Sequence, residues 1–124
     1  AGRTRAPLKN PEFLDRRYAL CDRAGEVHSI RIDQFGRNHL YFAKDLCLYP
    51  YLEKFNGITS YRIEAQDYAP ALVALVTKTY RTALDALSRG EKAFDESALA
   101  ALAEKSPRAF GLGIYRFRES KDSI

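Results

Sequence analysis

The chain of 124 residues contains no methionine and no tryptophan, and it has only two cysteines, Cys21 and Cys47. Without a methionine, residue 1 is not a retained initiator, so we expect a processed chain or a piece of a longer one. No apolar run is long enough to span a bilayer, which excludes a membrane-spanning protein of the helical kind. Two cysteines without a signal-like apolar segment predict a reducing, cytoplasmic setting. No internal repeat is visible.

The charge balance is mild, with 20 basic and 16 acidic residues and a formal net charge of +4. Such an excess is compatible with RNA as a partner but is far from a dedicated basic patch. Basic residues gather near both ends of the chain, where the plainer interpretation is solvated termini. The motifs G-x-S-x-G and H-E-x-x-H are absent from the sequence, so the residues themselves give no support to a serine hydrolase or a zinc protease.

The periodicity predicts one domain over residues 10–118, between a flexible arm at 1–9 and a frayed tail at 119–124. Asn10 and Pro11 predict a short helix to about Arg16, and Pro50 precedes a second one at 51–55. The main predicted elements are a β-hairpin at 26–43, a strand at 58–64 and helices at 70–89 and 96–105.

Alternation within the predicted hairpin places Ile30 and Ile32 on the same apolar face as Leu40 and Phe42. The helix at 70–89 carries an apolar stripe and is followed by Gly90. The second helix is expected to be capped by Asp95 or Ser97 and closed by Pro107.

Four motifs stand in order between residues 21 and 64. They read C-D at Cys21-Asp22, I-R-I-D-Q-F-G-R at 30–37, K-D-L-C at 44–47 and R-I-E at 62–64. Together they resemble the collagenase-like peptidase U32 family, and the resemblance extends from about Phe13 to Tyr115.

The resemblance implies an α/β protein that is the C-terminal portion of a (βα)8-type barrel with an inserted β-hairpin. Seen as a fragment, such a piece would look like an α+β domain. It would lack strands that pair with its own edges, and unpaired edges invite pairing with other chains. The expected partners are therefore the remainder of the parent chain or a second copy of this one, with RNA as a further partner.

The resemblance also implies a metal site. Family members with a four-iron cluster hold it through an earlier cysteine pair, absent here, and two later cysteines that match Cys21 and Cys47. Other members use the motif cysteines and a histidine for zinc, which makes Cys21, His28, His39 and Cys47 the alternative ligand set, although their spacing is not finger-like. Two core cysteines and two ordinary histidines remain the structural interpretation.

The expected catalytic residues are Glu64 and Arg62, because the acid ends a strand just before a loop and a helix, where barrel enzymes keep reactive groups. A structural ion pair is the alternative. Family members follow this glutamate with glycine and arginine, whereas Ala65 and Gln66 stand here. Substrate contacts are expected from Lys44, Asp45 and Asp33, although Asp45 could cap a turn and Asp33 could stabilise one.

Two activities follow from the resemblance: hydroxylation of RNA bases or of a quinone precursor by iron–sulfur members, and a collagenase-like peptidase activity. The cysteines have a role in the first, which we prefer. A hypothesis from a different class of function is a non-catalytic peptide-binding or assembly module. It is indicated by open strand edges and by aromatic residues near the hairpin. The chain alone is expected to be inactive.

Overall fold

A computed structural model describes residues 17–55 and 57–116 of the chain. The chain divides into two compact units, residues 1–43 and residues 44–124, where the sequence predicts a single domain. Each unit is described by itself. The predicted arm at 1–9, the helix at 10–16 and the tail at 119–124 lie outside the described residues.

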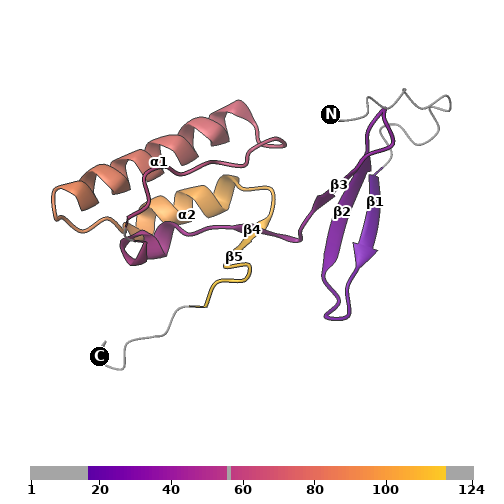
Figure 1. Cartoon of the computed structure of the whole chain (residues 1–124), viewed down its shortest axis with the longest axis horizontal. Helices are drawn as coiled ribbons and strands as arrows, with labels where there is room; N and C mark the ends of the chain where they lie inside the picture. The colour runs from indigo at the N-terminus through magenta and orange to yellow at the C-terminus, as the bar shows by residue number, and fades with distance from the viewer. Residues whose placement is uncertain (1–16, 56, 117–124) are drawn as a thin grey trace. The chain divides into compact units, whose positions relative to one another are not determined.

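The first unit is an antiparallel sheet of three strands, in the order β1-β2-β3 (Figure 1). Its strands are β1 (Arg17–Cys21), β2 (Val27–Ile32) and β3 (Asn38–Tyr41). The predicted hairpin is present as β2 and β3, and its register places Ile30 opposite Leu40, as the alternation predicts. Strand β1 pairs with β2 and adds a second hairpin, which is not among the elements predicted from the sequence.

The turn between β1 and β2 is built around one aspartate. The backbone N–H of Asp22 donates to the carbonyl oxygen of Glu26, and Gly25 N–H donates to the carbonyl of Asp22. The Asp22 side chain accepts the N–H groups of Ala24 and Glu26 at Oδ1, both at 2.9 Å. Gly25 has a φ of 84°, a left-handed conformation that favours glycine.

The turn between β2 and β3 repeats these contacts with Asp33, Gly36 and Arg37. Both turns share the pattern D-x-x-G-x-x-H, and in both the histidine ring contacts the turn aspartate through Nε2. This short duplication corrects the expectation that the chain has no internal repeat. Only three of the seven positions, the aspartate, the glycine and the histidine, are the same in both turns. The repeat is therefore hard to see in the sequence and becomes clear only from the hydrogen bonds.

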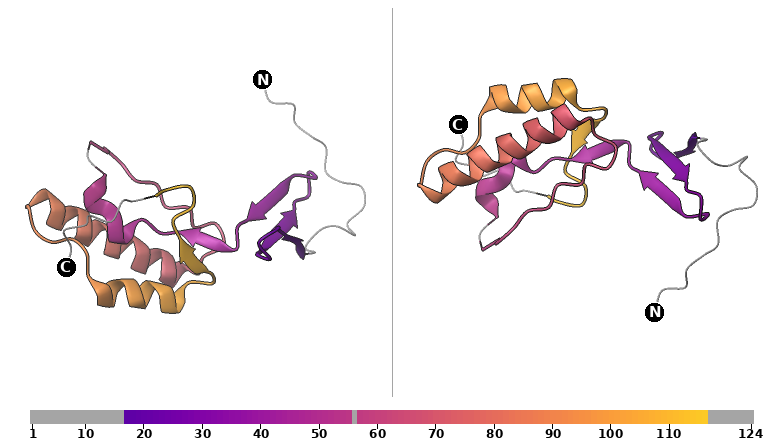
Figure 2. Two further views of the ribbon diagram at one scale, coloured as in Figure 1. Left: turned by 90° about the horizontal axis from the view of Figure 1, so that it is seen from below. Right: turned by 90° about the horizontal axis from the view of Figure 1, so that it is seen from above.

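The second unit combines two α-helices, a 3-10 helix and a two-stranded sheet, so the described chain is of the mixed α/β kind. Its elements are β4 (Lys44–Leu46), η2 (Tyr49–Lys54), α1 (Pro70–Ser88), α2 (Glu96–Lys105) and β5 (Ala109–Gly111). Strands β4 and β5 pair in parallel, with Asp45 opposite Phe110. Helices α1 and α2 lie side by side in both views of Figure 2.

Both long helices lie within one residue of their predicted limits because their end signals are local. Pro70 occupies the first turn of α1, where its missing N–H costs no helical hydrogen bond. Asp95 caps α2 by accepting the Ser97 N–H at 3.0 Å. None of the helices in the described ranges is long and apolar enough to cross a membrane.

The core of the second unit forms where η2 packs on α1. Cys47, Tyr49, Leu52 and Ala83 make one buried cluster. The Tyr49 hydroxyl accepts the Asp95 N–H at 3.0 Å, which ties η2 to the start of α2. The phenol therefore fills the apolar core without leaving its polar end unsatisfied.

Two predictions in this unit are wrong. Residues 58–64, predicted to be a strand, pair with no other strand in the part of the chain that the structure describes. A strand requires a neighbour for its N–H and C=O groups, and alternation along the sequence cannot supply one. Asp45, a predicted turn cap, lies instead within β4.

Replacing Leu52, which is 2% exposed, with alanine should lower the free energy of unfolding by about 2–5 kcal/mol, because it leaves a cavity in the core. Leu46→Ala is the control in the same unit, and since Leu46 is 54% exposed the loss should stay below about 1 kcal/mol. Urea denaturation followed by circular dichroism measures both. Equal losses for the two variants would contradict the described core.

Candidate functional site

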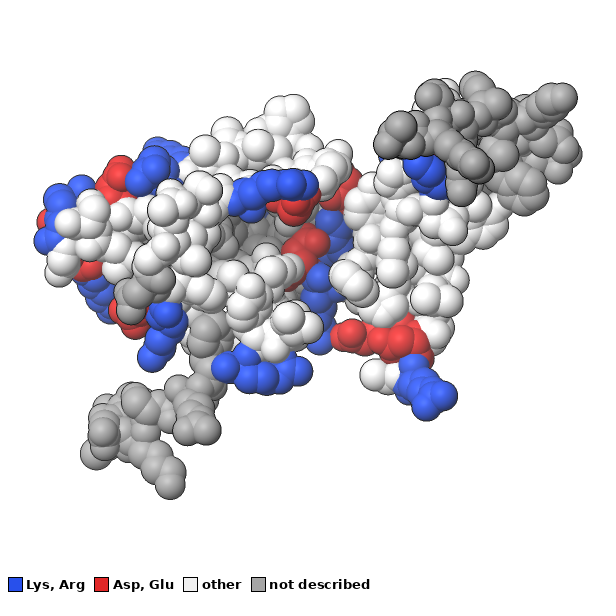
Figure 3. Space-filling view, viewed as in Figure 1, with Lys and Arg blue, Asp and Glu red and all other residues white. Residues whose placement is uncertain are grey.

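The second unit contains a cavity of about 680 Å³ between β4, α1 and the segment that precedes α1. Figure 3 shows a hollow on this unit with acidic and basic side chains along its edge. A volume of this order is typical of small-molecule sites. Four of the seven predicted site residues line it: Asp45, Cys47, Arg62 and Glu64.

Arg62 and Glu64, the expected catalytic residues, form an ion pair, with Arg62 Nη2 at 2.6 Å from Glu64 Oε1. The two side chains are 83% and 55% exposed, so the pair lies in solvent and not in a buried barrel interior. Gln66 also donates a hydrogen bond to Glu64, through its side-chain amide. An exposed pair of this kind contributes little to stability, which leaves both groups available to a ligand at the rim of the cavity.

Asp45 belongs to a network of charged and phenolic groups at one end of the cavity. Arg108 Nε donates to Asp45 Oδ1 at 2.7 Å, and the same guanidinium donates to both carboxylate oxygens of Asp67. The Tyr68 hydroxyl donates to Asp45 Oδ2 at 2.6 Å. Burial, followed by the contact with Asp45, raises the pKa of Tyr68 to about 12. Tyr68 therefore remains a neutral hydrogen-bond donor at physiological pH.

Cys47 lines the cavity from its core side. The thiol is 7% exposed, and its Sγ lies 3.8 Å from the hydroxyl of Tyr80 on α1. Burial and the neighbouring Cys47 raise the pKa of Tyr80 above its ordinary value. The phenol therefore keeps its proton, and either group can donate in this contact because a thiol and a phenol each carry one hydrogen.

Residues 15–124 match the family model described as Peptidase family U32. The chain belongs to the peptidase U32 family. This match confirms the family suggested by the four sequence motifs, and it includes both units. No curated protein and no solved structure matches the chain.

The remaining three predicted site residues of this U32 chain do not line the cavity. Lys44 is in β4, where its side chain runs along Gly111 of β5. Asp33 belongs to the second turn of the first unit, and its carboxylate accepts hydrogen bonds from Arg37 and pairs with His39. Cys21 is exposed at the end of β1. The contacts of Asp33 are those of a residue that stabilises a turn.

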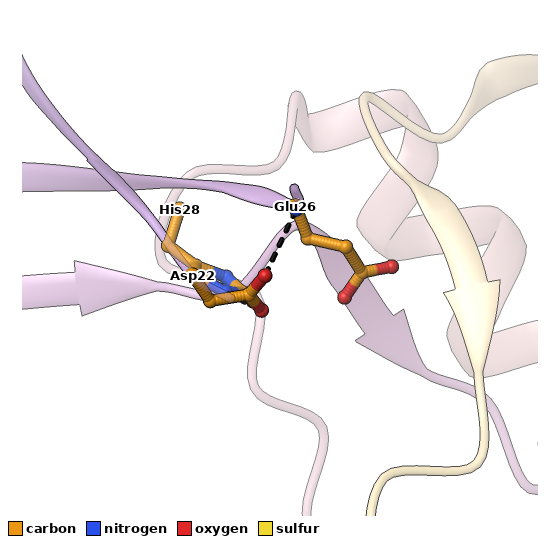
Figure 4. Close-up of side chains that lie close together, drawn as sticks. All are labelled: Asp22, Glu26 and His28. Atoms are coloured by element: carbon orange, nitrogen blue, oxygen red, sulfur yellow. Dashed lines mark hydrogen bonds and ion pairs between the residues drawn. The ribbon is translucent and has the colours of Figure 1, made fainter. Parts of the chain in front are cut away.

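The first turn also brings together Asp22, Glu26 and His28, whose ligand atoms lie within 4.8 Å of one another (Figure 4). His28 Nδ1 accepts the backbone N–H of Ala43 at 2.9 Å. The proton of the neutral ring is therefore on Nε2, which donates to Asp22 Oδ2 at 3.0 Å. A histidine that binds a metal normally donates its other ring N–H, whereas His28 accepts there. The cluster is thus a poor fit for a metal ion.

The alternative zinc ligands within the first unit are not brought together. Cys21 is opposite Val27, while His28 is opposite Leu20, so the thiol and this ring point to opposite faces of the sheet. His39 shares the face of Cys21, but it is in the row of Arg17, which is four positions before Cys21 on β1, a separation of about 13 Å. These three side chains therefore cannot ligate one ion.

Three residues of the site are not among those predicted from the sequence: Tyr68, Tyr80 and Arg108. Tyr80 belongs to the apolar stripe of the predicted helix, and Arg108 to the basic residues near the end of the chain. Arg108 had one signal, its place in a stretch with Phe110 and Gly111 that resembles the family. Tyr68 had none, because its partner Asp45 is 23 residues away along the chain.

The tautomer of His28 is a direct consequence of this geometry. We expect two-bond nitrogen–proton couplings in the NMR spectrum to show a neutral ring with the proton on Nε2. Asp22→Asn should preserve the tautomer, because the Ala43 hydrogen bond to Nδ1 is unchanged. A proton on Nδ1, or a shift of the His28 resonances on addition of stoichiometric zinc, would contradict the assigned hydrogen bonds.

The raised pKa of Tyr68 predicts a pH effect with a definite sign. Because this pKa is about 12 in the folded chain and 10 ordinarily, the contribution of Tyr68 to stability is complete below pH 10. It is lost as the pH rises towards 12. Absorbance at 295 nm of the wild type minus Tyr68→Phe isolates this titration, and Asp45→Asn should move its midpoint down. An unchanged midpoint in Asp45→Asn would show that the hydrogen bond is not formed.

Proposed function

We propose that the chain is the C-terminal part of a U32 barrel enzyme that depends on an iron–sulfur cluster and hydroxylates an RNA base or a quinone precursor. The observation that supports this most is the cavity of the second unit. It gathers Cys47, both expected catalytic residues and one expected substrate residue around one space, although these come from separate motifs of the sequence. A cytoplasmic location belongs to the same proposal, and both cysteines are free thiols.

The donor set tests whether a cluster fits. A four-iron cluster is generally held by four thiolates, and the chain has only two cysteines. Cys21 belongs to the first unit and Cys47 to the second. Residues 1–124 alone therefore do not fit a complete cluster. In this proposal, at least two further thiolates come from other parts of the parent protein.

The cavity walls suit a planar, partly apolar substrate. Apolar side chains of α1, α2 and β5 contribute Val76, Leu84, Leu102 and Phe110. The polar groups stand at the edges, where the Tyr68 hydroxyl is held by Asp45 and where Arg62 and Glu64 are exposed. Such a combination of apolar walls with a few placed polar groups binds a ring and fixes its orientation.

The unpaired segment 58–64 supports the barrel in this proposal. It borders the cavity with Ile58 50% exposed and Ile63 37% exposed. In a closed barrel, neighbouring strands would pair with this segment and cover these side chains. The rest of the parent chain, or a second copy, would supply them.

The same segment favours a second candidate, a peptide-binding or assembly module. An extended peptide from a partner could add to the unpaired backbone and place side chains in the cavity. A collagenase-like peptidase is the alternative implied by the family description. It has less support, because a peptidase with a nucleophilic side chain needs a base beside it. The hydrogen bonds of both histidines in the described residues are instead to Asp22, Asp33 and the N–H of Ala43.

Iron and sulfide analysis of the full parent protein, purified without oxygen, tests the proposed function. We expect about four irons per chain in the wild type, and loss of more than half of them in Cys47→Ala and in Cys21→Ser. Alanine is chosen at Cys47 because, unlike serine, it puts no hydroxyl group into a buried apolar position. Ser88→Ala, an exposed change at the end of α1, is the control and should retain its iron.

Circular dichroism of each variant separates cluster loss from unfolding. An iron-free wild type whose hydroxylation activity survives both cysteine replacements would overturn the proposal. A clean monomer of the isolated chain without affinity for any peptide would count against the assembly module.

A further inference from the structure

The polar face of the β1-β2-β3 sheet carries a row of basic side chains. The register places Arg17 directly opposite Arg31, and Arg31 directly opposite His39. Residues that are directly opposite on paired strands project to the same face. Since neighbouring strands are about 4.8 Å apart, the row crosses the sheet over about 10 Å.

Arg17 and Arg31 are exposed, and neither makes a hydrogen bond or an ion pair with any residue in the described part of the chain. Like charges directly opposite each other destabilise a sheet. The fold therefore keeps two arginines in a repulsive arrangement that a bound anion would relieve.

Within residues 17–55 and 57–116, the surroundings of the row contain little opposing charge. Strands β1, β2 and β3 contain no acidic residue at all. The nearest acid in the adjoining turn is Asp33, whose carboxylate already accepts from Arg37 and contacts His39. Arg37 itself is 62% exposed, so it extends the basic surface beyond the strand ends.

The next row on the same face consists of Ala19, Ser29 and Tyr41. A hydroxyl group and an aromatic ring beside two arginines are the side chains that contact the sugar, the phosphate and the base of a single-stranded nucleic acid. A surface for an acidic peptide needs no aromatic ring in this place. The combination favours a nucleic acid as the anion.

We propose that this polar face binds the phosphate backbone of RNA, through Arg17 and Arg31. The inference rests on the proposed function and narrows it, because it makes RNA and not a quinone precursor the substrate class. Guanidinium groups suit this role since their planar N–H pairs match the oxygens of a phosphate.

Fluorescence anisotropy of the full parent protein with a labelled single-stranded oligoribonucleotide, measured at several salt concentrations, tests the inference. We expect Arg17→Ala/Arg31→Ala to weaken binding by about tenfold or more at low salt. Loss of two phosphate contacts should reduce the slope of log K against log salt by about 1.4 for a single strand. The charge-retaining pair Arg17→Lys/Arg31→Lys should keep most of that slope and guards against a folding defect.

Lys54→Ala/Lys78→Ala is the matched control. It removes two positive charges from exposed positions of the second unit that do not line the cavity, so binding and slope should stay close to wild type. Equal weakening in both double variants would show a general charge effect and overturn the inference. Unchanged binding in Arg17→Ala/Arg31→Ala would overturn it as well.

Three further outcomes distinguish the failure of this inference from the failure of the proposed function. If poly-glutamate displaces the oligoribonucleotide as well as unlabelled RNA of equal charge does, the face is a general polyanion surface and RNA is the wrong partner. If iron is present in the same samples while RNA does not bind, this inference fails and the iron–sulfur proposal stands. If an iron-free wild type binds RNA through the two arginines, the iron–sulfur proposal fails and the RNA-binding face stands.

Discussion

The position of Arg108 between two carboxylates organises the second unit. Its guanidinium joins Asp45 of β4 to Asp67, which lies just before α1, while its own backbone leads into β5. Contact with both acids raises its pKa above the ordinary value, so the charge is permanent. Three segments distant in sequence thus meet at one cation, and they form one end of the cavity.

The network also explains how Asp45 differs from Glu64, the other acid that lines the cavity. Arg108 and Asp45 are only 20% and 19% exposed, so their interaction is less screened than that of the exposed Arg62 and Glu64. One carboxylate accepts from a guanidinium on one oxygen and from a phenol on the other. Asp45 therefore binds Arg108, which holds the unit together, and Tyr68, which lines the cavity. The same carboxylate connects the stability of this unit with the geometry of its site.

The first unit uses polar groups in a different way. Its two turns satisfy their own backbone N–H groups through Asp22 and Asp33, and each aspartate also orients a histidine. The hydrogen bond to the ring is the largest cause of the lowered pKa of both acids. Residue types that suggest metal binding or catalysis in a sequence are here parts of a turn. The surface left for a partner is the polar face of the sheet, where Arg17 and Arg31 have no acidic partner among the described residues.

The sequence by itself determined the features that depend on neighbouring residues: the family, the two long helices with their Pro70 and Asp95 signals, and the register of Ile30 against Leu40. Only the tertiary structure decided the contacts between distant segments. It placed Asp45 in a strand beside Arg108 and Tyr68, set the thiol of Cys47 against Tyr80, and left residues 58–64 without a paired strand among the described residues. The physical reason is that helix caps and hydrophobic periodicity depend on residues a few positions apart. An ion pair or a pair of β-strands instead requires a partner from a distant segment, which the local sequence does not identify.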